Sequence, residues 1–111
     1  MSNHPIRVLL DTCVPRRLAR DLSGFQVRHA TEMGWSDLDD GPLLDAMTGS
    51  FDALVTVDRN LPHQQNLVVR PFAVLLLRAH SNRLTDLARL VPKLRAALKR
   101  VEPGQLVELA E

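Results

Sequence analysis

The sequence is poor in cysteine and aromatic residues, and it contains no long apolar run. A single cysteine, Cys13, among 111 residues excludes an intramolecular disulfide and a cysteine-based zinc site. It also fits a reducing cytosol. The longest apolar run, residues 72–77, is far too short to span a bilayer. Residues 1–5 have no apolar stretch of the kind that signal peptides need. We therefore expect a cytoplasmic protein with no membrane segment and no signal peptide.

Excess charge of one sign is also absent. The formal net charge is +1, so bulk attraction to nucleic acid or membrane is excluded, and such binding would need a local patch. Lysine is rare: of the 14 Lys and Arg residues, Lys93 and Lys99 are lysines and the rest are arginines. Arginine suits phosphate recognition, although genome composition explains its excess equally well.

What is present is a short series of strand and helix patterns. Apolar or alternating runs predict five strands. They cover residues 6–10, 25–30, 51–57, 72–77 and 106–109. Helices are predicted from Pro15 to Gly24, over residues 42–48, and from Ser81 or Asn82 onward.

Two connections carry further signals. Asp39 or Asp40 is expected to cap the second helix, and residues 59–70 are expected to be a polar loop with a short turn near Pro62. Pro92 falls inside the 3.6-residue pattern of the last helix, so it should kink that helix or split it in two. The order of elements predicts a small three-layer α/β/α domain with a mostly parallel sheet, spanning residues 1–111.

Two aspartates, Asp11 and Asp58, each follow an apolar strand, and they are the sharpest chemical feature of the sequence. In an open parallel sheet, ligands bind at the carboxyl ends of the strands. Two carboxylates placed there on neighbouring strands repel each other unless a cation lies between them. Oxygen ligands of this kind suit Mg²⁺ or Mn²⁺. The alternative is that each aspartate only caps a turn or a helix.

A third carboxylate would complete such a site. Asp40, Asp39 and Asp45 are the candidates, with Asp40 preferred unless it serves only as a helix cap. We therefore predict Asp11, Asp40 and Asp58 as catalytic metal ligands.

Cationic side chains are expected to form a rim beside these carboxylates. Such a rim would hold phosphates that the carboxylates repel, although each member is equally explained as a solvated loop charge. The predicted nucleic-acid contacts are Arg59, Arg78, His80 and Arg83, with His63 as a further member of the rim. Trp35 is expected to stack on a base or to cover the core, and Cys13 to be a small buried side chain near the site.

Three segments together resemble the short bacterial PIN-like proteins, relatives of the PIN-domain ribonucleases that include toxins of toxin–antitoxin pairs. They are residues 9–18 (LLDTCVPRRL), residues 32–35 (EMGW) and residues 54–62 (LVTVDRNLP). The resemblance extends over about residues 7–107, and the threonine–x–aspartate–arginine–asparagine segment is its most specific part.

The resemblance implies a parallel sheet and an acidic cluster that binds Mg²⁺ or Mn²⁺. It also implies a metal-activated water that hydrolyses RNA phosphodiesters. Asp11 and Asp58 match acidic positions of the family directly. An antitoxin-like protein and a second copy of the chain are the implied partners. Within the cationic rim, we expect Arg59 and Arg78 to contact phosphate.

Two departures from the family pattern set the alternative. Thr12 stands where the family often has an acidic residue, and Pro42 stands where it often has a glutamate. Fewer carboxylates lower the charge of a site and hence its metal affinity. The alternative is therefore a catalytically degenerate PIN-like module that binds a protein partner. A phospho-acceptor receiver domain fits less well, because Asp11 has no acidic neighbour and neither Lys93 nor Lys99 ends a strand.

Overall fold

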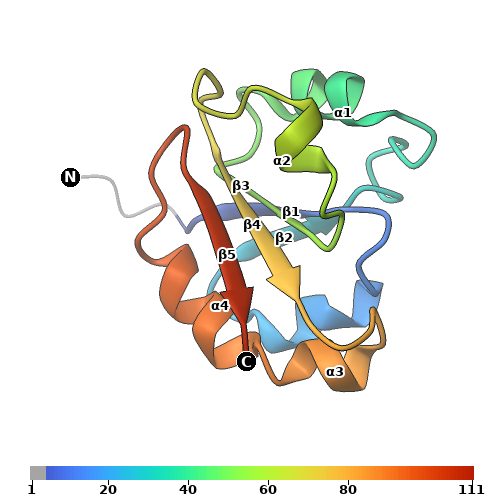
Figure 1. The fold of residues 1–111 in the computed structure, drawn as a ribbon, viewed down its shortest axis with the longest axis vertical. Helices are drawn as coiled ribbons and strands as arrows, with labels where there is room; N and C mark the ends of the chain where they lie inside the picture. The colour runs from blue at the N-terminus through green and yellow to red at the C-terminus, as the bar shows by residue number, and fades with distance from the viewer. Residues whose placement is uncertain (1–4) are drawn as a thin grey trace.

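The computed structural model describes residues 5–111, and five parallel strands form its centre (Figure 1). Their bounds are β1 Arg7–Leu10, β2 Gln26–His29, β3 Ala53–Thr56, β4 Ala73–Arg78 and β5 Leu106–Ala110. The strands lie in the order β2-β1-β3-β4-β5, and every neighbouring pair is parallel. All five predicted strands are confirmed, with small shifts at their ends. Residues 1–4, most of the segment on which the signal-peptide prediction depends, lie outside the described residues.

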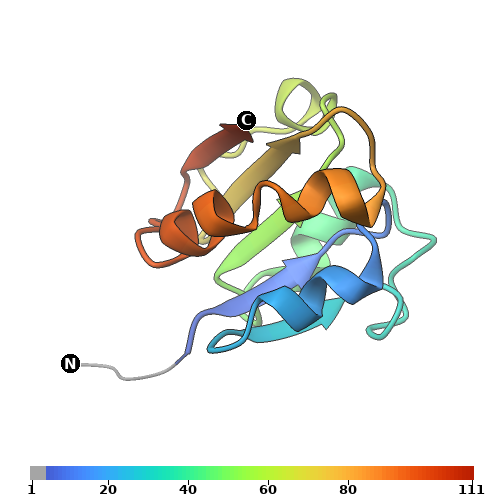
Figure 2. The ribbon, with the colours of Figure 1, turned by 90° about the horizontal axis from the view of Figure 1, so that it is seen from below.

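Helices cover both faces of the sheet, which confirms the α/β/α prediction. Figures 1 and 2 show α1 and α2 on one face, and η1, α3 and α4 on the other. The bounds are η1 Arg16–Asp21, α1 Asp40–Met47, α2 Leu61–Gln64, α3 Leu84–Ala88 and α4 Val91–Leu98. No helix within residues 5–111 is long and apolar enough to cross a membrane.

The alternation of side chains along the strands divides the interior into two apolar cores. Val8 and Leu10 of β1 pack with the η1, α3 and α4 layer, whereas Leu9 packs with the α1 and α2 layer. Every residue of β3 is buried, and so are the first five of β4, because central parallel strands are covered on both sides. The two edge strands, β2 and β5, alternate between exposed and partly buried positions over most of their length.

The first helix, η1, is a 3-10 helix, although the sequence predicts an α-helix from Pro15 to Gly24. Its hydrogen bonds span three residues, from the Leu18 N–H to the Pro15 oxygen and from the Leu22 N–H to the Ala19 oxygen. The tighter winding still buries both leucines against the sheet. Gly24, with φ +91°, then turns the chain towards β2.

Helix α1 starts two residues earlier than predicted, at Asp40 instead of Pro42. Asp39 occupies the cap position, one of the two predicted, although its side chain makes no hydrogen bond there, and Asp40 lies inside the first turn. A proline near the start is tolerated, since the first N–H groups of a helix have no partner within it. Because α1 begins at Asp40, this residue lies at the end of the helix that faces the carboxyl edge of the sheet.

Two later predictions fare differently. The segment predicted as a polar loop contains the short helix α2. Pro92 splits the last helical segment as predicted, because α3 ends at Ala88 and α4 begins at Val91. The Ser81 hydroxyl accepts a hydrogen bond from the Arg83 N–H and donates one to Asp86, although Arg83 itself occupies the cap position of α3.

Arg7 and Asp52 join the amino ends of β1 and β3. The guanidinium donates to both carboxylate oxygens at 3.2 and 3.1 Å, and the Arg7 backbone N–H donates at 2.9 Å. Burial alone would raise the pKa of Asp52, but these hydrogen bonds and the Arg7 charge outweigh it and hold that pKa below its usual range. This pair aligns the two strands whose opposite ends carry Asp11 and Asp58.

We expect Asp52→Asn to lower the free energy of unfolding by about 1 kcal/mol at pH 7. The value is small because the two side chains are 43% and 38% exposed, and solvent screens them. A depressed folded-state pKa stabilises above the unfolded pKa, and this contribution is lost as pH falls through the folded pKa. Urea unfolding should therefore show a smaller difference between parent and variant at pH 3 than at pH 7. An equal difference at both pH values would contradict the charge-based role.

Candidate active site at the carboxyl ends of the strands

A pocket of about 400 Å³ lies where β1 and β3 end. Asp11, Asp40 and Asp58 all line it, so the structure brings together the three carboxylates that the sequence nominates. The other lining residues are Thr12, Cys13, Ser36, Leu38, Val57 and Asn82. This is the edge at which parallel α/β sheets bind ligands.

The Thr56 hydroxyl connects two of these carboxylates. It donates to Oδ2 of Asp11 at 2.7 Å and accepts from the Asp58 backbone N–H at 3.1 Å. Thr56 is fully buried, and Asp11 is 8% exposed. The Thr12 backbone N–H donates to Oδ1 of Asp11 at 2.7 Å, so both oxygens of this carboxylate are held. Each carboxylate oxygen can accept more than one bond, so Asp11 keeps acceptor capacity towards the pocket.

Asp58 is positioned by its own turn. Its Oδ1 accepts from the Asn60 backbone N–H at 2.9 Å, which is the pattern of an aspartate that organises the residues after it. Asp58 therefore does cap a turn, as the alternative interpretation predicts, but it uses one oxygen to do so. The turn engages this one oxygen, so turn formation does not consume the whole carboxylate.

The three carboxylates lie close enough together to affect the pKa of Asp40. Partial burial and the negative charges of Asp58 and Asp11 raise its pKa to about 6. A hydrogen bond with Asp58 and the charge of Asp39 act in the same direction. A carboxyl group responds in this way where like charges converge, and such convergence is common at functional sites.

The carboxylates do not form a ready-made metal cage. Among residues 5–111, no group of three or more His, Cys, Asp or Glu side chains is arranged to hold a metal ion. Mg²⁺ seldom needs such a cage, because it keeps several waters and binds through one or two carboxylates together with substrate phosphates. The oxygen-only donors of Asp11, Asp58 and Asp40, and the repulsion among them, fit an ion of this class.

The other acidic candidates are placed differently. Asp45 forms a 2.6 Å ion pair with Arg70 and does not line the pocket. Asp39 is exposed and does not line the pocket, although its charge contributes to the raised pKa of Asp40. Of the three candidates for the third carboxylate, Asp40 alone lines the pocket.

The predicted cationic rim is more dispersed than the carboxylates. Arg59, Arg78, His80 and Arg83 are all exposed, and they are not among the residues that line the pocket. Arg78 lies 3.6 Å from Glu108 and shares its charge with that side chain. His63 is exposed as well. Asn82, which the sequence suggests only as a helix cap, is the polar residue of this segment that reaches the pocket.

Cys13 lies near the site, whereas Trp35 packs over the core. Cys13 is near the site as predicted but exposed, with its sulfur 3.7 Å from the Thr56 hydroxyl oxygen. Crowding by protein atoms and the charge of Asp11 raise the pKa of the thiol, so it is a poor nucleophile at neutral pH. Trp35 meets Phe51 edge to face at 6.0 Å between ring centres and covers the core.

His29 is a buried polar residue that sequence reasoning missed. Its Nε2–H donates to the Val14 oxygen at 2.7 Å, and its Nδ1 accepts from the Thr31 N–H at 3.2 Å. The imidazole therefore ties the segment after Asp11 to the loop that leads towards Asp40. Its place at the end of an edge strand carries no sequence signal that distinguishes it from an exposed histidine.

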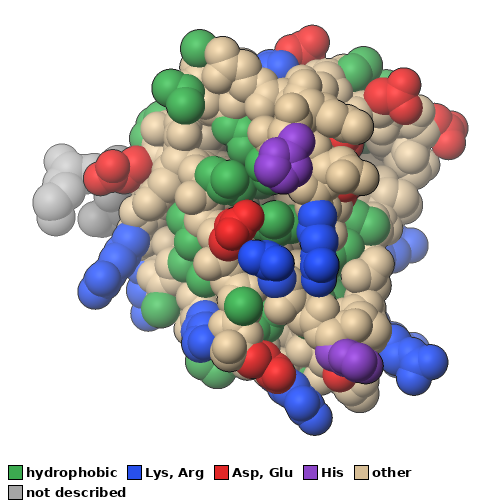
Figure 3. Space-filling model, viewed as in Figure 1, with side chains coloured by type: hydrophobic (Ala, Val, Ile, Leu, Met, Phe, Trp, Pro, Cys, Tyr) green, Lys and Arg blue, Asp and Glu red, His purple; other side chains and the backbone are tan. Residues whose placement is uncertain are grey.

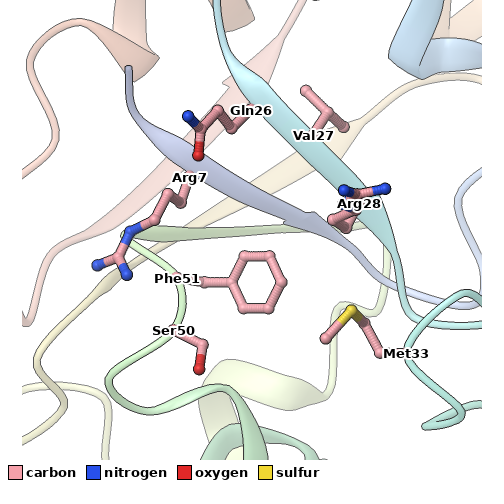
Figure 4. A pocket seen from close by; sticks show the side chains of 7 residues that line it. All are labelled: Arg7, Gln26, Val27, Arg28, Met33, Ser50 and Phe51. Atoms are coloured by element: carbon pink, nitrogen blue, oxygen red, sulfur yellow. The ribbon is translucent and has the colours of Figure 1, made fainter. Parts of the chain in front are cut away.

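A second pocket, of about 580 Å³, lies at the opposite, amino ends of the strands. Figure 4 shows the Phe51 ring beneath β1 and β2, with Arg7 and Arg28 to either side of it. Both arginines are engaged, Arg7 with Asp52 and Arg28 with Glu32. This pocket therefore offers no uncompensated charge, and the carboxylate pocket is the better candidate site.

We expect Thr56→Val to reduce the free energy of unfolding by about 1–3 kcal/mol, because it leaves the Asp58 N–H and Oδ2 of Asp11 without their shared partner. Thr56→Ser keeps the hydroxyl and serves as the matched control, with a smaller loss from the missing methyl group. Urea unfolding at pH 7 measures both. Equal losses in the two variants would show that packing alone accounts for Thr56.

We expect Asp40→Asn to stabilise the metal-free protein by about 1 kcal/mol at pH 7, after allowance for solvent screening. A folded-state pKa raised to about 6 contributes stability below the unfolded pKa that is lost as pH rises through about 6. The gain should therefore vanish near pH 4. Asp45→Asn is the control outside the pocket and should not show this gain. Thermal unfolding across pH 4–8 checks the prediction, and a pH-independent difference would contradict it.

The candidate site is defined by its own geometry. Its carboxylates come from the end of β1, the start of α1 and the turn after β3, and the fold alone brings these segments together. Comparison of the chain with models of protein families, with curated proteins and with solved structures finds no match.

Proposed function

We propose that this chain is a Mg²⁺- or Mn²⁺-dependent ribonuclease-like domain of the PIN type, which hydrolyses RNA phosphodiesters. The supporting observation is the convergence of Asp11, Asp40 and Asp58 on one pocket at the carboxyl ends of β1 and β3. Partial burial and, next to it, repulsion from Asp58 and Asp11 raise the pKa of Asp40, and a divalent cation would relieve that repulsion.

Asp11 and Asp58 are the proposed metal ligands, with Asp40 as the third. A bound ion of this kind lowers the pKa of its water and neutralises developing charge on a phosphate. Thr56 and the Thr12 backbone N–H hold Asp11 in one orientation, and the Asn60 N–H holds Asp58. Fixed carboxylates reduce the reorganisation that binding would otherwise require.

Arg59 and Arg78 are the proposed phosphate contacts near this edge. Arg59 directly follows Asp58, and Arg78 is the last residue of β4. His80 and Arg83 continue the same segment towards α3. By resemblance to toxin-type PIN ribonucleases, the proposed biological role is the toxin of a toxin–antitoxin pair, with an antitoxin-like protein as partner and a homodimer as the assembly.

The alternative function is a PIN-like binding module that has lost catalysis and acts through a protein partner. Thr12 and Pro42, which replace acidic residues of the family pattern, favour it. The lack of a preformed cluster of three metal-binding side chains within residues 5–111 favours it as well. Metal binding separates the two functions, because only the nuclease requires it.

We expect Mn²⁺ to bind the parent protein in calorimetric titration, and Asp11→Asn to lose most of this binding. Asp58→Asn should abolish cleavage of single-stranded RNA without lowering thermal stability. The reason is that asparagine retains the oxygen that accepts from the Asn60 N–H, while it removes one negative charge beside Asp40.

Asp45→Asn is the matched control, because it also replaces one aspartate by asparagine, but at a position outside the pocket. It should bind Mn²⁺ and cleave RNA like the parent. Cleavage by Asp58→Asn at the parent's rate would refute the site assignment. Absence of Mn²⁺ binding up to millimolar concentration would favour the binding module instead.

A further inference from the structure

One helical layer carries most of the positive charge of the molecule. Residues 16–21 and 83–102, which include η1, α3 and α4, contain nine of the 14 Lys and Arg residues but only three of the 13 Asp and Glu residues. The layer therefore has an excess of six positive charges in a chain whose formal net charge is +1. The nine cations are Arg16, Arg17, Arg20, Arg83, Arg89, Lys93, Arg95, Lys99 and Arg100.

These segments form one continuous surface. Helix η1 packs against α3, and the Arg95 guanidinium of α4 donates to the backbone oxygens of Asp21 and Ser23. Figure 2 shows η1 lying beside α3 and α4 on the same face of the sheet. In Figure 3, several acidic side chains gather at the upper right, near α1 and the loop before it, while Lys and Arg side chains project from the lower rim, where a few acidic side chains also lie, and from the middle of this face. Charge is thus segregated between the two helical layers.

Cations of this layer differ from the others in their partners. Four of the five arginines elsewhere, Arg59 excepted, form ion pairs. Within residues 5–111, Arg89 alone of this basic layer (residues 16–21 and 83–102) forms one, with Glu111, while Lys93 and Arg95 donate to backbone oxygens. The remaining six are exposed, and the structure records no ion pair for them within residues 5–111. They are Arg16, Arg17, Arg20, Arg83, Lys99 and Arg100.

The unpaired cations begin at the carboxylate pocket. Arg83 follows Asn82, which lines the pocket, and Arg16 and Arg17 open η1 three and four residues after Cys13, which lines it too. Side chains three residues apart eclipse each other in a 3-10 helix. Arg17 and Arg20 therefore project in one row, about 6 Å apart along the axis at a rise of about 2 Å per residue.

We propose that the exposed surface of η1 and α3 is the binding track for single-stranded RNA, with its phosphates on Arg83, Arg17 and Arg20 and one end at the carboxylate pocket. This inference rests on the proposed function for the identity of the ligand. A row of uncompensated arginines suits a chain of phosphates.

A membrane surface fits this layer less well than RNA. Amphipathic helices that bind membranes present exposed apolar side chains beside their cations. Among the described residues, the exposed large apolar side chains are Leu38, Val68, Val69 and Leu106, and these lie outside η1, α3 and α4.

The test is the salt dependence of RNA binding, measured in EDTA so that cleavage plays no part. A labelled 12-nucleotide oligouridylate would be titrated with protein by fluorescence anisotropy between 50 and 200 mM KCl. We expect Arg17→Gln/Arg20→Gln to weaken binding about tenfold or more at 100 mM salt. The slope of log K against log salt should fall by about 1.4, since each lost contact to single-stranded nucleic acid contributes about 0.7.

Arg28→Gln/Arg70→Gln is the matched control, because it removes the same charge from paired arginines outside the layer. It should leave the salt slope unchanged and alter the affinity by no more than about twofold. Equal losses in both double variants, no loss in Arg17→Gln/Arg20→Gln, or no RNA binding by the parent would each overturn the proposal. Arginine-dependent binding to phosphatidylserine vesicles without RNA binding would assign the surface to membranes.

The outcomes separate this inference from the nuclease proposal. RNA binding that depends on Arg17 and Arg20, in a protein that never cleaves RNA, would retain the track and refute the nuclease. Metal-dependent cleavage with an unchanged KM in Arg17→Gln/Arg20→Gln would retain the nuclease and refute the track. Asp58→Asn should bind the oligonucleotide at least as tightly as the parent in EDTA, because it loses a negative charge near the track.

Discussion

The pairing of β1 with β3 is the constraint on which the candidate site depends. Parallel pairing brings two strand ends to one edge, and each is followed by an aspartate. Like charges placed together in this way cost free energy, and the buried Thr56 hydroxyl offsets part of that cost by bonding to both segments. Asp40 adds a third charge from α1, and partial burial together with repulsion from Asp58 and Asp11 raises its pKa. An arrangement that opposes stability in this way is typical of a site maintained for chemistry.

Charge segregation gives the two helical layers different characters. The α1 side contributes Asp39, Asp40 and Asp45, while η1, α3 and α4 hold cations with few carboxylate partners. The pocket lies at the boundary between them, since its lining includes Asp40 from one side and Asn82 from the other. A polyanion on the basic layer would thus reach the carboxylates at one end, where a cation would be needed to offset their repulsion of its phosphates.

Much of the fold was predictable because local patterns and the sheet agree. Short apolar runs bounded by turn residues predicted the central strands, and alternating apolar and polar residues predicted the edge strand β2, so the strands follow from local patterns. Pro92 interrupts a helix wherever it falls, so the split between α3 and α4 also follows. Asp11 and Asp58 were recognisable because each follows an apolar strand pattern, and parallel strands end at one edge of the sheet. The winding of η1 and the start of α1 were not predictable, because differences of one or two hydrogen bonds per helix decide them.

The sequence by itself determined the three-layer class, the parallel strands and two of the three carboxylates, since each of these is encoded within a few neighbouring residues. Only the tertiary structure decided that Asp40, rather than Asp39 or Asp45, joins them, because this depends on where a loop returns across the sheet and on Arg70 engaging Asp45. The roles of Thr56 and His29 likewise depend on partners far along the chain or in another loop. The basic surface is a property of packing, because it exists only where η1 lies against α3 and α4, and no single segment of sequence contains it.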